Sequence, residues 1–391
     1  MTEGARDYSG FFRDGDDAIA RAYVDRSFGA GAYLDFEPGA AGRDEILVAS
    51  TASARDYMMQ SASCATSGGQ IFRVRPSLIE TIRPNAFATR HRDLHLCGMN
   101  TGMYGAIFEL CNFVMAQPGL FRDIGEPGRE TATPLPPGVV PGFWLIDQLR
   151  IHGTIIDKSL APSLMPKCPE RYHFAVALTL HVMRFVWFHE MCHCLNGHVG
   201  ALVDIVPSIR LNEMPDDSAL ATLVELEQAS LPMNASAFLQ AIELDADRSA
   251  LWAAFRTQSE DKENVIALQQ FDQAQRIKLS LLSAYLITFI MEEASRRLNS
   301  ERRESHPDSY TRLHNLVRTT ASHLLDARTG MQAIFYDVMR ELKVLRGAIP
   351  SLVDVDQVLA DCLSPQFQAV LDDKEEQVET ARSYFITFSF N

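Results

Sequence analysis

The chain has 391 residues, of which 47% are hydrophobic and 22% charged, so it can bury a sizeable core in one large domain or two. Its 50 acidic and 36 basic residues give a formal charge of −14. This balance argues against nucleic acid or an anionic membrane as a partner, because no basic excess exists to neutralise phosphates. The seven cysteines lack the spacing of a disulfide framework, and the first residues contain no apolar signal core. We therefore expect a cytoplasmic protein.

The first part of the chain is weakly patterned. Residues 1–69 show no sustained hydrophobic period, and we assign them no role. Short strands are predicted at 71–75 and 94–97, and a helix at 102–116. The segment 118–142 contains 11 Pro or Gly residues, which predict a long surface loop, more typical of an insertion than of a lid.

An HExxH pentapeptide lies inside an apolar run, 169–196, that is predicted to be a buried helix. Four residues apart, His189 and His193 project from one helical face and can share a metal ion. Glu190 can then serve as general base for a water molecule beside that metal, as in zinc peptidases. The alternative is a pair of core histidines with Glu190 at the helix surface.

Three further residues near this motif carry metal-binding atoms. Cys192 and Cys194 cannot join the histidines at one metal, because neighbouring helical side chains diverge by about 100°, and we expect them to be small core residues. His198 follows a Gly that is predicted to end the helix. For His198 a capping or surface role is expected, with a metal contact as the alternative.

A catalytic zinc ion needs a third protein ligand and one open position. In a helical pattern over 236–255, Glu243 and Asp247 are four residues apart and share a face. Glu243 can therefore be the third ligand, while Asp247 hydrogen-bonds the outer nitrogen of a ligand histidine. The alternative is a solvated acidic face, but the apolar residues that follow favour burial, where acids need a metal or a cation.

The HExxH helix followed by this acidic helix resembles the gluzincin peptidases related to the CAAX prenyl proteases and the heat-shock membrane peptidases. Those families carry an Asn-x-x-Ala edge strand before the HExxH, and residues 85–88 match it. They also carry a later His-Pro with an Arg six residues after the His, as His306 and Arg312 do here. The resemblance implies that Asn85 and Ala86 bind the substrate backbone and that His306 and Arg312 stabilise the oxyanion. Without it, the His-Pro would be interpreted as a helix start.

The resemblance and the residue patterns together predict a mainly helical α+β protein, with a small edge sheet beside the HExxH helix and the second ligand helix. The predicted peptidase domain covers 70–326 with an insertion at 117–168. It is followed at 327–391 by a C-terminal helical extension with a strand-like tail. No segment is long and apolar enough to span a membrane, in contrast to the membrane peptidases. In this respect the chain is similar to the Lit-like phage-exclusion peptidases of bacteria.

The predicted function is that of a soluble endopeptidase with one catalytic Zn²⁺ ion, which hydrolyses a protein or peptide substrate in bacterial stress or phage defence. The alternative from another class is a non-catalytic protein whose fold is fixed by zinc, or a pseudopeptidase that acts as a binding scaffold.

Overall fold

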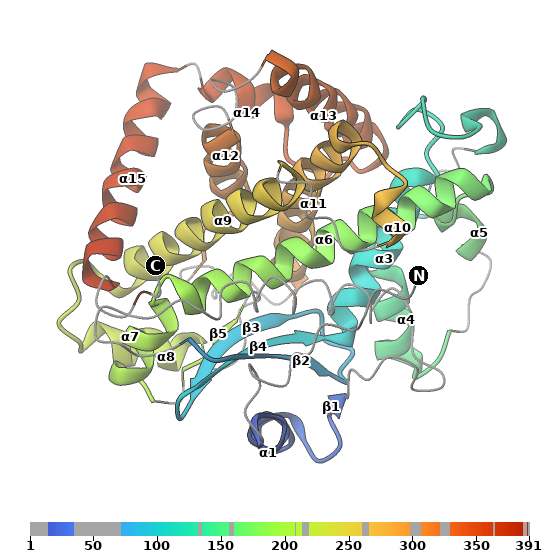
Figure 1. Ribbon diagram of the computed structural model, residues 1–391. Coiled ribbons are helices and arrows are strands. Elements are labelled where there is room, and N and C mark those ends of the chain that lie inside the picture. The colour runs from blue at the N-terminus through green and yellow to red at the C-terminus, as the bar shows by residue number, and fades with distance from the viewer. Residues whose placement is uncertain are drawn as a thin grey trace, which may run out of the picture.

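The computed structural model describes residues 15–34, 72–131, 135–155, 160–207, 209–212, 219–259, 266–297, 306–320, 329–362, 364–385 and 389. Of the residues that the structure describes, 67% are helical, and they include a small mixed sheet of five strands. The prediction of a mainly helical α+β protein is therefore confirmed (Figure 1).

The sheet has the order β1-β2-β4-β3-β5. Its strands are β1 (Tyr33–Leu34), β2 (Val74–Ile79), β3 (Ala86–His91), β4 (Leu94–Asn100) and β5 (Leu211–Asn212). Only β2 and β4 are parallel, and the other neighbours are antiparallel. A two-residue turn joins β3 to β4, and in it Arg92 has a φ of 59°. A left-handed residue in such a turn matches the twist of the two strands that it connects.

The strand predicted at 94–97 is confirmed as part of β4, whereas the one predicted at 71–75 begins at Val74 and extends to Ile79. Residue 71 lies outside the described residues. The predicted strand ends before Pro76, whereas the observed β2 includes it. Pro76 pairs with β4 on one side, and β1 reaches only residues 78 and 79 on the other. A residue without an N–H group is tolerated at such an edge position.

The helices form layers on both faces of the sheet. They are α1 (Asp16–Phe28), α3 (Thr101–Met115), η1 (Pro127–Arg129), α4 (Trp144–His152), α5 (Ala161–Leu164), α6 (Pro169–Leu195), α7 (His198–Ile205), α8 (Ala219–Glu227), α9 (Ala235–Ser259), α10 (Ile266–Gln269), α11 (Gln273–Arg297), α12 (Ser309–Thr320), α13 (Thr329–Ala348), α14 (Val355–Cys362) and α15 (Pro365–Phe385). In Figure 1, α6 crosses one face of the sheet with α9 and α11 beyond it, and α1 lies against the other face. Among the described residues, no helix has both the length and the apolar character of a membrane span.

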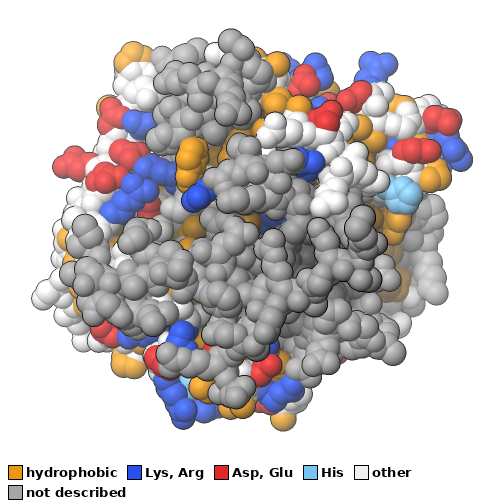
Figure 2. Space-filling view, in the orientation of Figure 1, with side chains coloured by type: hydrophobic (Ala, Val, Ile, Leu, Met, Phe, Trp, Pro, Cys, Tyr) orange, Lys and Arg blue, Asp and Glu red, His pale blue; other side chains and the backbone are white. Residues whose placement is uncertain are grey.

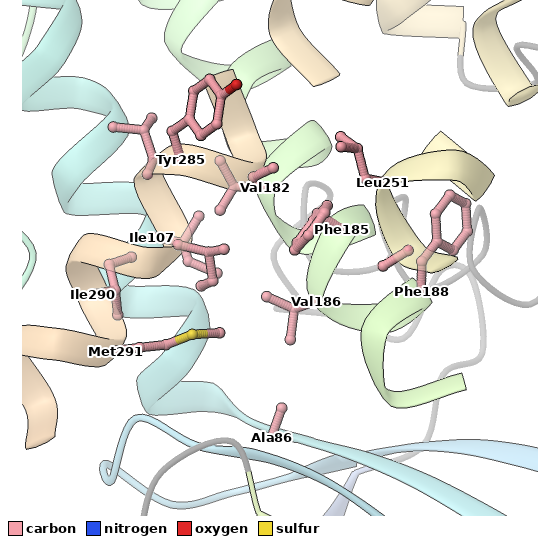
Figure 3. Packing of buried hydrophobic residues seen from close by; sticks show 14 of the residues in the cluster. Ala86, Ile107, Val182, Phe185, Val186, Phe188, Leu251, Tyr285, Ile290 and Met291 are labelled. Atoms are coloured by element: carbon pink, nitrogen blue, oxygen red, sulfur yellow. The ribbon is translucent and has the colours of Figure 1, made fainter. Parts of the chain in front are cut away.

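Helix α6 is the centre of the core. It begins with Pro169 at its first turn and ends at Leu195 with Asn196 as its C-cap, after which Gly197 adopts a φ of 85°. A Pro start and a left-handed Gly after the end are the signals that predicted these bounds. Its side chains are buried nearly all round, because α3, α9, α11 and the sheet surround it. Figure 3 shows its apolar side chains among those of the neighbouring elements, with the labelled residues Val182, Phe185, Val186 and Phe188 from α6, Leu251 from α9, Ile290 and Met291 from α11, and Ala86 from β3.

The predicted loop at 118–142 is anchored to the start of α6. The fully buried Arg171 donates hydrogen bonds to five backbone carbonyls at the end of α3 and in the loop: those of Met115, Gln117, Leu120, Phe121 and Ile124. Glu130 accepts the backbone N–H groups of Lys167 and Cys168, where α6 begins. A negative side chain is favourable at this positive end of a helix.

The two ends of the described chain are more helical than predicted. Helix α1 lies in the region to which we assigned no element, and its Asp16, Ala20 and Val24 are buried at four-residue spacing. At the other end, Tyr384 and Phe385 belong to α15 and not to a strand. The alternation of aromatic residues suggested a strand, but Val378, Ala381 and Phe385 are buried at helical spacing. Residues 386–388 lie outside the described residues.

Helix α15 packs on α9. On the side of the molecule where α15 lies, Figure 2 shows acidic and basic side chains interspersed, with no large patch of one sign. An ion pair joins Arg318 of α12 to Asp372 of α15 at 2.8 Å.

Candidate metal centre

Helices α6 and α9 bring three metal-binding side chains together. The Nε2 atoms of His189 and His193 are 3.0 Å apart. Glu243 places its Oε2 atom 3.3 Å from Nε2 of His189 and its Oε1 atom 3.5 Å from Nε2 of His193. All three side chains are buried. This group can hold a metal ion, and among the described residues it is the one group of this kind.

The separations fit a tetrahedral ion. At metal–ligand distances of about 2.0–2.2 Å, atoms at the corners of a tetrahedron lie about 3.3–3.6 Å apart. The separation of the two Nε2 atoms is a few tenths of an ångström below this range, and each Nε2 atom has one oxygen of the Glu243 carboxylate within it, Oε2 for His189 and Oε1 for His193. Oε2 of Glu243 has no hydrogen-bond partner among the described residues although it is buried, which is the state expected of a metal ligand.

The protonation state of His193 also suits a ligand. Burial lowers the pKa of His193 well below its usual value, and the neighbouring His189, His198, Arg312 and His306 lower it further. The imidazole is therefore neutral near pH 7 and has a lone pair to offer a cation.

Glu190 is buried in α6, with 1% of its surface exposed. The alternative of a glutamate at the helix surface therefore does not describe this molecule. As the residue after His189, it lies about 100° round the helix from the first ligand. Such a buried carboxyl group needs a polar or charged neighbour.

Asp247 lies behind His189, as the four-residue spacing on α9 predicted. Its Oδ1 atom is 3.0 Å from Nδ1 of His189, which is the outer nitrogen when Nε2 faces the metal. Arg312 of α12 donates two hydrogen bonds to the same carboxylate. Its Nε atom donates to Oδ2 at 2.7 Å, and its Nη2 atom donates to Oδ1. Asp247 and Arg312 are 1% and 2% exposed. The residue expected at the oxyanion thus contacts Asp247 and sets its position.

The expected edge strand is bordered by another strand. Residues 86–88 start β3, but β5 pairs with it, placing Asn212 opposite Phe87 and Leu211 opposite Ala88. Ala86 is fully buried and pairs with β4 on the inner side. In the described part of the chain, the backbone edge that the resemblance assigns to substrate is therefore taken by the chain's own β5. Pairing satisfies backbone groups that an edge strand would leave open.

Asn212 also accepts hydrogen bonds from the polar side chains that were expected to contact substrate. Nδ2 of Asn85 donates to Oδ1 of Asn212 at 3.0 Å, and Nε2 of His306 donates to its backbone oxygen at 2.6 Å. His306 is next to the metal ligands, since its Nε2 atom is 4.0 Å from Oε1 of Glu243. The structure thus places His306 next to the ligand group, and Asn212 connects Asn85 to His306.

His198 has a place that its sequence position did not predict. It starts α7 after the Gly197 turn and is 1% exposed. Its Nδ1 atom lies 3.1 Å from Nδ1 of His193, and its Nε2 atom lies 3.0 Å from Oδ2 of Asp245. Burial by itself raises the pKa of Asp245, but the hydrogen bond from His198 and the charge of Arg382 outweigh it and lower the pKa to about 2.

The neighbouring cysteines are core residues, as predicted. Cys192 and Cys194 are 4% and 0% exposed, and Sγ of Cys194 lies 3.8 Å from Sγ of Cys97 on β4. Burial raises the pKa of the Cys192 thiol to about 12, so it is not a thiolate ligand near pH 7.

Comparisons of the chain with protein-family models, with curated proteins and with solved structures give no match.

Proposed function

We propose that the chain is a zinc-dependent endopeptidase that hydrolyses protein or peptide substrates. The observation that carries the proposal is the buried group of His189, His193 and Glu243, in which one ligand atom from each residue lies within 4.8 Å of the others. Two imidazoles and a carboxylate that leave the fourth position open are typical of catalytic zinc, whereas structural zinc sites use four protein ligands.

In this proposal Glu190 accepts the proton of the attacking water and passes it to the leaving amine. When bound, zinc would polarise the scissile carbonyl and lower the pKa of the water molecule. Glu190 directly follows the ligand His189 in α6 and is buried with it, which supports a role beside the same metal.

His306 is the proposed donor to the oxygen that becomes negative. Its Nε2 atom lies close to Glu243 and already donates to a backbone carbonyl, that of Asn212. A substrate carbonyl in the same position would receive the same hydrogen bond, which strengthens as charge develops on the oxygen. We assign Arg312 to the positioning of Asp247 instead, because the two form a buried bidentate pair.

The test compares the zinc-loaded wild type with Glu190→Gln on an unfolded protein such as casein. Because Glu190 is not one of the three ligands, the variant should keep its zinc and lose hydrolysis. A chelator should abolish the wild-type activity, and added zinc should restore it. Cleavage that continues in Glu190→Gln with stoichiometric zinc would refute the role of this residue as base.

A second candidate is a non-catalytic protein in which the same metal fixes the fold. The observation that favours it is the pairing of β5 with β3, which covers the strand expected to take substrate. The two candidates differ in the effect of metal removal. Unfolding of the whole chain upon chelation, monitored by circular dichroism, would favour the structural role, whereas a folded chain without activity would favour catalysis.

A further inference from the structure

The outer nitrogens of the two histidine ligands, which point away from the metal position, face different chemical groups. The outer nitrogen of His189 faces a carboxylate directly, that of Asp247, at 3.0 Å. The outer nitrogen of His193 faces a second imidazole, that of His198, at 3.1 Å. A carboxylate follows only after this extra ring, where Nε2 of His198 lies 3.0 Å from Oδ2 of Asp245. The sequence motif contains no signal for this second arrangement.

The hydrogen-bond directions in this chain of groups are determined by its two ends. If His193 binds a metal through Nε2, its Nδ1 atom carries the hydrogen and must donate. Nδ1 of His198 then accepts, so the hydrogen of His198 lies on Nε2 and is donated to the Asp245 carboxylate. An ionised Asp245 carboxylate can only accept hydrogen bonds. Each of the three groups therefore has one arrangement of its hydrogens that is consistent with the others. This order fixes the tautomer and the ring plane of His193.

Asp245 is itself held from two sides. Nδ2 of Asn196, the C-cap residue of α6, donates to Oδ2 at 2.8 Å. Nε of Arg382, in the last turn of α15, donates to Oδ1 at 2.6 Å. His198 also packs on Phe385 of the same helix, with 4.9 Å between ring centroids. The ring of His198 is therefore fixed both by hydrogen bonds and by contact with α15.

We propose that His198 is a positioning residue for the metal ligand His193, and that Asp245 and Arg382 hold it in place, so that helix α15 contributes to metal affinity. This inference rests on the metal site of the proposed function, but not on catalysis. Partners behind a ligand histidine typically change metal affinity by about 10–100-fold when they are removed.

Two substitutions separate positioning from packing. His198→Phe keeps a ring against Phe385 but removes the acceptor for His193. His198→Asn keeps an acceptor, because its Oδ1 atom is bonded to Cγ as Nδ1 of histidine is, but it loses the ring and its packing. The measured quantities are the zinc dissociation constant, from competition with a chelator of known affinity, and the melting temperature of the metal-free protein.

We expect His198→Phe to bind zinc about 10–100-fold more weakly with a melting temperature near that of the wild type. His198→Asn should melt at a lower temperature yet lose less zinc affinity than the Phe variant. His314→Phe is the matched control, since His314 is also fully buried but contacts Cys362, on α14, and should bind zinc like the wild type.

The outcomes distinguish this inference from the proposed function. Unchanged zinc affinity in His198→Phe, or a loss of affinity that follows the melting temperature across both variants, would overturn the positioning role while leaving catalysis untouched. Zinc bound by the wild type without any hydrolysis would remove the peptidase proposal but not this inference. A wild type that binds no zinc would overturn both.

Discussion

Replacement of Arg312 by glutamine distinguishes two roles for this residue. In one, Arg312 stabilises the oxyanion of the reaction, as the resemblance implies. In the other, it holds Asp247 behind the ligand His189, as the hydrogen bonds from Nε and Nη2 indicate. The two roles predict different measurements, because only the second couples Arg312 to the stability of the fold and to zinc affinity.

The expected magnitude follows from burial. Arg312 and Asp247 are 2% and 1% exposed, so Arg312→Gln leaves a carboxylate in the interior without its cation. Breaking a buried pair from one side typically costs about 3–5 kcal/mol of unfolding free energy. Asp247 also lies 3.0 Å from the outer nitrogen of His189, so its displacement should weaken zinc binding by about 10–100-fold.

Urea unfolding of the metal-free protein measures the first quantity, and zinc competition with a chelator measures the second. Arg318→Gln is the matched control on the same helix, because its partner Asp372 is exposed and such pairs contribute about 0–1 kcal/mol. In an Asp247→Asn background the substitution of Arg312 should cost less, since the buried negative charge is already gone.

A different pattern would refute this role. If Arg312→Gln unfolds and binds zinc like the wild type but lowers turnover by about 10²–10³-fold, Arg312 acts on the oxyanion and the pair with Asp247 is incidental. Equal costs of Arg312→Gln in the wild-type and Asp247→Asn backgrounds would likewise show that the two side chains are not coupled.

Two further predictions concern a metal ligand and a buried acid elsewhere. Glu243→Ala should release most of the zinc, whereas Asp247→Ala should weaken zinc binding by about 10–100-fold. Elemental analysis and zinc titration measure both effects. Full zinc content in both variants would contradict the prediction. Glu109 accepts three backbone N–H groups at the start of α4, and burial raises its pKa from 4.5 to about 7. An acid whose folded pKa is raised stabilises fully below the unfolded pKa and loses this stabilisation as the pH rises through the folded pKa. Unfolding free energy should therefore fall by roughly 3 kcal/mol between about pH 4.5 and about pH 7, relative to Glu109→Gln. A parallel pH profile for the variant would contradict it.

The ligand set was predictable because it depends on spacing within single helices. His189 and His193 are one turn apart on α6, and Glu243 and Asp247 are one turn apart on α9. A helix places residues four apart on one face whatever its surroundings. That the two faces meet was inferred from buried acids that need a cation, which is an argument from energy and not from geometry.

The contacts that escaped prediction join residues far apart in the chain. β5 has only two residues, and its pairing with β3 spans more than a hundred positions, so no local periodicity marks it. The turn at Gly197 was predicted, but the path of α7 back towards His193 was not. Arg171 was likewise not singled out in the sequence, although its five carbonyl partners fix a long loop.

The charges around the site give an independent reason for a divalent cation. Four carboxyl groups are buried there, each 1–3% exposed: those of Glu190, Glu243, Asp245 and Asp247. Two arginines from the C-terminal part of the chain, Arg312 and Arg382, bind Asp247 and Asp245. These six groups carry two more negative than positive charges when all are ionised. Buried charge is costly without a counter-charge, and one divalent cation would neutralise the excess. The arginines of α12 and α15 hold Asp247 and Asp245, and in the proposed function Glu243 and Glu190 would then serve the metal and the water.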